Sequence, residues 1–201
     1  MQVLETFPTE FFIFENTLID NQSLIDKIKE LKKTVDENAG HISLLINLKN
    51  YSEFDNLILW FEQCLNDIRQ HMKYDCDEFK ITNSWANCYL AKSGTSINMH
   101  RHSMSFFSGI YYLTDGSPTI FEDPVTHRSQ AQLEVLRFNY SPHIPIETQP
   151  GKLCIFPSWM FHSSIPHYGS EDRYIISFNS LPSGHINYTM ATDSRAHITV
   201  K

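Results

Sequence analysis

Three histidines in the second half of the chain have the spacing of a metal site. His100 and His102 are two residues apart, and residues at i and i+2 of a strand point to the same face, so both imidazoles can reach one ion. His162 follows a Pro-Gly turn at 150–151 and a short apolar run that ends at Pro157. That arrangement would hold the third imidazole in a fixed place. The sequence therefore predicts a metal site formed by His100, His102 and His162.

An arginine after the third histidine adds an anion-binding group to this pattern. Alternation along a strand that begins at Arg173 places Ile175, Ser177 and Asn179 on the same face. An arginine that points into an apolar barrel needs an anionic partner, because burying an unpaired charge is costly. Its fork of N–H donors fits a carboxylate. The acids at 171–172 would not share its face, which favours an external carboxylate over an internal one.

The elements that must position these side chains change character near residue 80. A short strand-like run within 1–20 precedes two helices, which cap residues and apolar spacing predict at 21–34 and 52–73. The stretch 37–51 is polar and interrupted by turn residues. Farther along, runs rich in β-branched and aromatic residues alternate with turns, which favours a sandwich or a double-sheet jelly roll. The expected strands lie at 80–91, 95–102, 105–114, 118–122, 131–139, 144–148, 152–156, 161–165 and 172–181.

Length and composition indicate one α+β, mainly β domain. The 201 residues, 41% of them hydrophobic, suffice for a single core but leave little for a second. We expect one domain over 1–201, with helical support in 1–79, a β core in 80–181 and a tail in 182–201. For the tail, the sequence predicts at most one weak strand. The net charge of −7 disfavours a nucleic-acid-binding surface, because such surfaces are usually basic.

Cysteine usage and the N-terminus bear on the compartment. The four cysteines form no C-x-x-C pair and are typical of reduced thiols in a cytoplasmic protein. The N-terminus lacks the combination of a basic start, an apolar run and a small-residue cleavage site. No run reaches the roughly 18 apolar residues that a membrane span needs. We therefore expect a cytoplasmic protein that makes no membrane contact.

The stretch 97–180 resembles the iron(II)- and 2-oxoglutarate-dependent oxygenases, in particular a small bacterial and phage branch of them. The matching segments, in chain order, are HRHSMSFFSGIYYLTD, TIFEDP, PGKLCIFPSWMFH and RYIISFN. The resemblance implies a double-stranded β-helix with iron at one mouth. It also implies that 2-oxoglutarate chelates the metal while its far carboxylate pairs with Arg173. The activity it implies is a dioxygenase that hydroxylates an unidentified substrate and releases succinate and CO2.

The resemblance also suggests which residues border the cosubstrate. Asn87 and Tyr89 alternate on one face of a strand that borders the 2-oxoglutarate site in this family. Tyr89 or Tyr111 is expected to bond an oxygen of 2-oxoglutarate. The predicted cosubstrate-binding residues are Arg173, Tyr89, Tyr111, Asn87, Ser177 and Asn179.

His102 departs from the family pattern, because most members have an aspartate or glutamate there and bind iron with two histidines and one carboxylate. Three interpretations follow. His100, His102 and His162 form an all-histidine set, or Asp123 supplies the carboxylate while one of the paired histidines supports the ligands from behind. In the third, the ion is zinc rather than catalytic iron, since three histidines also suit zinc. The all-histidine set is preferred, with Asp123 second.

Two other classes of protein fit part of the pattern. A cupin-like metalloprotein that works without 2-oxoglutarate would use the histidines but has no evident use for Arg173. A non-catalytic metal-binding module would keep the barrel and lose the chemistry, and His102 gives this interpretation some weight. The expected partners are a small-molecule cosubstrate and an unidentified prime substrate. The helical N-terminal half is a candidate surface for homodimer formation.

Overall fold

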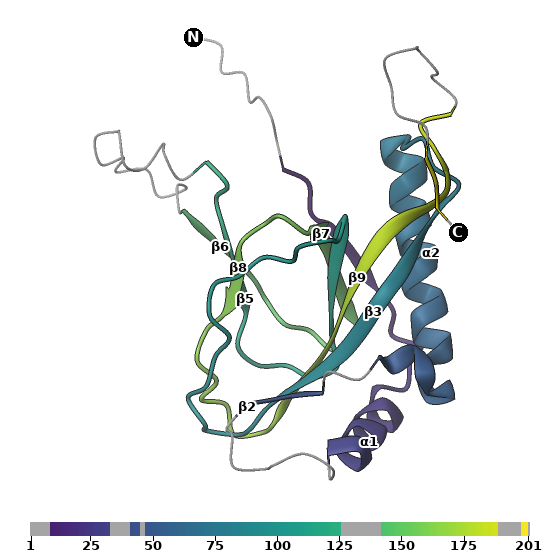
Figure 1. Ribbon diagram of the computed structural model, residues 1–201. Coiled ribbons are helices and arrows are strands. Elements are labelled where there is room, and N and C mark those ends of the chain that lie inside the picture. The colour runs from purple at the N-terminus through teal and green to yellow at the C-terminus, as the bar shows by residue number, and fades with distance from the viewer. Residues whose placement is uncertain (1–8, 33–40, 45–46, 126–141, 189–197, 201) are drawn as a thin grey trace, which may run out of the picture.

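Two antiparallel sheets face each other in the computed structural model, which describes residues 9–32, 41–44, 47–125, 142–188 and 198–200 (Figure 1). The larger sheet has the strand order β1 (Phe12–Glu15), β7 (Lys152–Pro157), β4 (Phe107–Tyr112), β9 (Arg173–Ile186), β3 (Glu78–Tyr89) and β2 (His41–Leu44), and β10 (Ile198–Val200) pairs with β9. The smaller sheet has the order β6 (His143–Ile146), β5 (Thr119–Glu122) and β8 (His162–Ser164). This is the predicted jelly-roll architecture, a double-stranded β-helix.

The helices cover the outer face of the larger sheet, on the side away from the smaller sheet (Figure 1). They are α1 (Asn21–Lys32) and α2 (Asp55–Met72), with short 3-10 turns η1 (Leu48–Asn50) and η2 (Ser52–Phe54) between them. Helix α2 ends at Met72, and the left-handed backbone of the next residue, Lys73, lets its N–H donate to carbonyls of the last turn. No helix in the described part of the chain has the length and apolar content needed to cross a membrane.

The larger sheet separates two apolar cores. Phe61 of α2 packs with Tyr111 and Phe178 on the helical side. Between the two sheets lies a second cluster that includes Tyr112 and Phe156. Because side chains alternate across a strand, Tyr111 and Tyr112 of β4 belong to different cores. The cluster between the sheets is the one that borders the polar site described below.

Most expected elements are present, and the differences have structural causes. The stretch 95–102 holds no strand, only a single bridge between His100 and His162. The interrupted stretch 37–51 contains β2, which pairs with the edge of β3 from His41↔Tyr89 to Leu44↔Ala86. A four-residue strand gives little local signal, and it forms because β3 offers an unpaired edge. The strand expected at 131–139 lies outside the described residues.

Candidate metal centre

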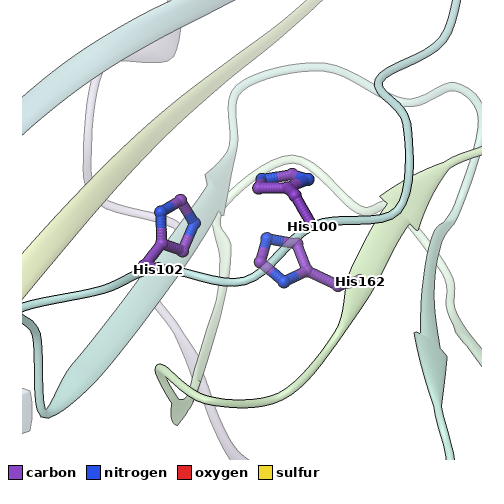
Figure 2. Close-up of side chains that lie close together, drawn as sticks. All are labelled: His100, His102 and His162. Atoms are coloured by element: carbon purple, nitrogen blue, oxygen red, sulfur yellow. The ribbon is translucent and has the colours of Figure 1, made fainter.

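The side chains of His100, His102 and His162 lie close together and face one another (Figure 2). The ring centroids of His100 and His162 are 4.3 Å apart, and each lies 5.1 Å from that of His102. One ligand nitrogen from each ring lies within 4.8 Å of the other two. Three imidazole nitrogens gathered this closely can bind one divalent metal ion.

Backbone hydrogen bonds bring these distant segments together. His100 and His162 exchange two bonds, since the His100 N–H donates to the His162 carbonyl at 2.9 Å and the His162 N–H donates back at 2.8 Å. The His102 N–H donates to the carbonyl of Ser158 at 3.0 Å. The loop that carries the paired histidines is therefore fixed by bonds to the segment around β8, although it forms no strand of its own.

Two of the rings are held in one tautomer. Nδ1 of His100 lies 2.8 Å from the carbonyl oxygen of Asn98, and Nδ1 of His162 lies 3.1 Å from that of Met160. A carbonyl oxygen only accepts, so Nδ1 carries the proton and Nε2 keeps its lone pair. A backbone carbonyl behind the ring is a common support for a metal-binding histidine.

Burial keeps these ligands in the neutral form that binds metal. Burial, together with repulsion from His100, lowers the pKa of His162 to about 3. The same two causes lower the pKa of His102 to about 4. Both rings are therefore neutral at pH 7, and protons compete weakly with a metal for them.

The metal-free protein should lose stability in mild acid. A histidine in an unfolded chain titrates near pH 6.5. Between about pH 6.5 and pH 4, His102 and His162 are therefore protonated in the unfolded chain but remain neutral in the folded protein. The free energy of unfolding should then fall by about 1 kcal/mol per pH unit for each ring. Urea unfolding at pH 7, 6 and 5 measures this slope, which should be shallower for His102→Asn. Equal slopes for the two proteins would contradict the assignment.

Arg173 lies buried in the same cavity as the histidines, and no described residue gives it a polar partner. Its side chain is 1% exposed, and none of its three guanidinium nitrogens has a hydrogen-bond partner among the described residues. The guanidinium carbon lies 4.6 Å from the ring centre of Tyr89 and 5.9 Å from that of Tyr112. Aromatic faces attract a cation but satisfy none of its N–H donors. The cavity therefore offers an anion the N–H donors of all three guanidinium nitrogens.

The cavity itself is built mainly by paired strands. Strands β3 and β9 pair so that Tyr89 lies opposite Arg173. The predicted residues Arg173, Tyr89, Asn87 and Ser177 all line it, together with the three histidines. The remaining lining residues are Trp85, Ile97, Ile110, Thr119, Ser163, Ser164 and Ile175.

Two predicted cosubstrate-binding residues do not line this cavity. Tyr111 packs in the helix-side core, where its hydroxyl donates to the side-chain oxygen of Asn21 at 2.7 Å. The prediction for Tyr111 is wrong, because β4 turns its neighbour Tyr112 toward Arg173 instead. Asn179 has the expected strand position, but its side-chain oxygen accepts from the Ser108 hydroxyl at 2.8 Å, outside the cavity.

Sequence reasoning missed three residues around Arg173. The Tyr112 hydroxyl donates to Thr119 Oγ1 at 2.9 Å, and Thr119 faces the cavity. At Gly116, φ is +149°, and an added Cβ would lie 2.8 Å from Cδ of Arg173. The glycine thus leaves room for the arginine side chain. In the sequence, Asp115-Gly116 is typical of a turn and nothing more, because the contact of Gly116 with Arg173 depends on tertiary packing.

Asp123, the alternative ligand, lies elsewhere. It lines a separate hollow with Arg101, Trp159 and Phe161, and its carboxylate accepts from the backbone N–H of Val125 at 2.8 Å. Over the described ranges, the only group of three or more potential metal-binding side chains is the histidine trio.

Comparison with known proteins places this geometry in a family. Residues 83–179, which include the three histidines and Arg173, match the family described as "Putative 2OG-Fe(II) oxygenase". Over this range the chain matches the 2OG-Fe(II) oxygenases. Enzymes of this family use iron and 2-oxoglutarate, and the described residues fit both, with three gathered imidazoles for the metal and, for a carboxylate, a guanidinium that has no hydrogen-bond partner among them. A search of curated proteins gave no match.

Solved structures share the fold of the chain. A prolyl-4-hydroxylase from Pseudomonas putida aligns with a TM-score of 0.58 and 13% identity, over 88% of this chain and 94% of that one. HygX from Streptomyces hygroscopicus, solved with nickel and 2-oxoglutarate bound, aligns with a TM-score of 0.60 and 12% identity, over 96% of this chain and 91% of that one. The carbocyclase SnoK from nogalamycin biosynthesis aligns with a TM-score of 0.62 and 9% identity, over 88% of this chain and 81% of that one. At these identities the likeness shows the fold alone.

Proposed function

We propose that this 2OG-Fe(II) oxygenase hydroxylates an organic substrate, with iron on His100, His102 and His162 and the far carboxylate of 2-oxoglutarate on Arg173. The observation that carries the proposal is the buried guanidinium, which shares one cavity with the three histidines and has no polar partner in the described residues. A buried cation without a partner is costly. A dicarboxylate that reaches from the metal to Arg173 would supply the missing partner.

The protein's own residues bind and orient the reactants in this proposal. When bound, iron and 2-oxoglutarate would supply the chemistry together with O2: one oxygen atom enters succinate as 2-oxoglutarate loses CO2, and the other hydroxylates a substrate C–H bond. Arg173 holds the far carboxylate through its fork of donors. The apolar walls at Ile97, Ile110 and Ile175 limit water around the reacting groups.

The all-histidine ligand set is preferred over one that includes Asp123. The gathered rings and the separate place of Asp123 support it. Such a set carries no negative charge, so the cosubstrate alone would bring anionic ligands to the metal. We therefore expect iron to be held more weakly before 2-oxoglutarate binds than after it, since each stabilises the other in the same cavity.

Anaerobic titration tests the proposal. Adding Fe(II) and then 2-oxoglutarate to the wild-type protein should give a weak visible charge-transfer band that saturates near one equivalent. His162→Ala should give no band, because it removes a ligand. A wild-type protein that binds iron but not 2-oxoglutarate would rule the proposal out.

A metal-binding protein without turnover is the second candidate, and His102 in place of a carboxylate is the observation that favours it. Succinate formation separates the two. In air, with iron and 2-oxoglutarate but no prime substrate, the oxygenase should release succinate slowly through uncoupled turnover. A protein that gives the anaerobic band but no succinate would support the second candidate.

A further inference from the structure

We infer that His41 is a positioning residue for the cosubstrate, acting through the side-chain amide of Asn87. This inference rests on the proposed function. His41 belongs to β2 and lies outside residues 83–179, the range matched by the family. The family resemblance therefore assigns it no role, and the assignment comes from its contacts.

His41 lies against two residues of the cavity wall. It pairs in register with Tyr89 across the β2–β3 ladder, and directly opposite residues share a face of the sheet. Its ring centre lies 4.7 Å from that of Tyr89. Its Nε2 lies 3.3 Å from Oδ1 of Asn87. A carboxamide oxygen only accepts, so Nε2 of His41 carries the proton in this contact.

This contact sets the orientation of the Asn87 amide. Asn87 is buried and lines the cavity with Tyr89 and Arg173. Because His41 engages Oδ1, a carboxylate in the cavity meets the Nδ2 donor of Asn87 rather than its acceptor. An amide turned the other way would present an oxygen to an anion. His41 thus favours the orientation that adds a donor beside Arg173.

The ring of His41 is neutral, as this role requires. Its pKa is lowered by burial and by the positive charge of Arg173, while the contact with Asn87 opposes that shift. At neutral pH the ring therefore donates one hydrogen bond without adding a second cation beside the guanidinium. The geometry, rather than the charge of His41, carries the effect on the ligand.

Two substitutions separate the hydrogen bond from the packing. His41→Phe keeps an aromatic ring against Tyr89 but removes the donor. His41→Gln loses the ring but keeps an amide N–H that can reach Asn87. Isothermal titration calorimetry of the nickel-loaded proteins with 2-oxoglutarate should show binding about tenfold weaker for His41→Phe. His41→Gln should stay within about threefold of wild type, and nickel affinity should be the same in all three proteins.

A double-mutant cycle with Asn87→Ala tests whether His41 acts through Asn87. Asn87→Ala should weaken 2-oxoglutarate binding by itself, and adding His41→Phe should then change it less than twofold. A merely structural role would weaken binding by the same factor in both backgrounds. If His41→Phe does not fold, which thermal unfolding would reveal, His41→Leu takes its place with the same expectations.

The outcomes distinguish this inference from the proposed function. Wild-type protein that binds 2-oxoglutarate, with a His41→Phe variant that binds equally well, would overturn the inference alone. Additive effects in the cycle would overturn it too. Nickel-loaded wild-type protein that does not bind 2-oxoglutarate would overturn both.

Discussion

Arg173→Met should weaken 2-oxoglutarate binding by about 100-fold or more and leave metal affinity nearly unchanged. Removing one partner of a buried, hydrogen-bonded charge pair costs about 2–5 kcal/mol, and each 1.4 kcal/mol is a factor of ten in affinity. A protonated guanidinium is not a metal ligand, so the substitution leaves the three gathered histidines in place. Calorimetry with the metal first and 2-oxoglutarate second measures the two affinities separately.

The same substitution should raise the stability of the ligand-free protein. The guanidinium is buried with no hydrogen-bond partner in the described residues, and its contacts with Tyr89 and Tyr112 offset only part of that cost. Methionine fills a similar volume without a charge, so thermal unfolding should occur at a higher temperature. A gain in stability with a loss of ligand binding is expected where a residue is retained for function.

Arg101→Met is the matched control. Arg101 is exposed, and its guanidinium lies 5.3 Å from the ring centre of Phe161 in the hollow outside the cavity. An exposed charge is screened by solvent, so its loss should change 2-oxoglutarate binding less than about threefold. Equal effects of the two arginine variants would contradict a specific role for Arg173. Lower stability of Arg173→Met would contradict an unpaired charge there.

His102→Ala should reduce metal affinity by about 100-fold or more, whereas Asp123→Asn should leave it unchanged. Losing a residue that only supports a ligand typically costs 10–100-fold in metal affinity, so losing a ligand itself should cost at least as much. Asp123 lines a different hollow, and its carboxylate bonds a nearby backbone N–H. Anaerobic titration with Fe(II), or with Zn²⁺ and a competing chelator, measures both variants.

His102→Glu is the informative third variant. It places a carboxylate at the position where most of the family has an acid, on a side chain long enough to replace the imidazole. We expect metal affinity at or above that of wild type, because a negative ligand attracts the ion more strongly than a neutral one. The reverse result, with Asp123→Asn losing the metal and His102→Ala retaining it, would make Asp123 the third ligand.

The sequence by itself determined the architecture and the central residues of the site. Alternation within a strand is a local property, so Arg173 and Ser177 could be placed on one face from spacing alone. The spacing of His100 and His102 suggested their pairing too, but that stretch forms no strand, and backbone bonds to the segment around β8 hold the two histidines in place. The runs after residue 80 indicated a barrel for the same reason. The Pro-Gly turn before the strand that leads to His162 was equally readable, because turn residues act locally.

Tertiary structure decided what depended on pairing between distant segments. The choice between Tyr111 and Tyr112 follows from which face of β4 meets Arg173, and a one-residue difference reverses it. Strand β2 exists because β3 offers an edge, and only that pairing brings His41 to Asn87. The separation of Asp123 from the histidines likewise depends on how the loops pack. Spacing along the chain fixes which side chains share a face, but only the register between strands fixes what that face meets.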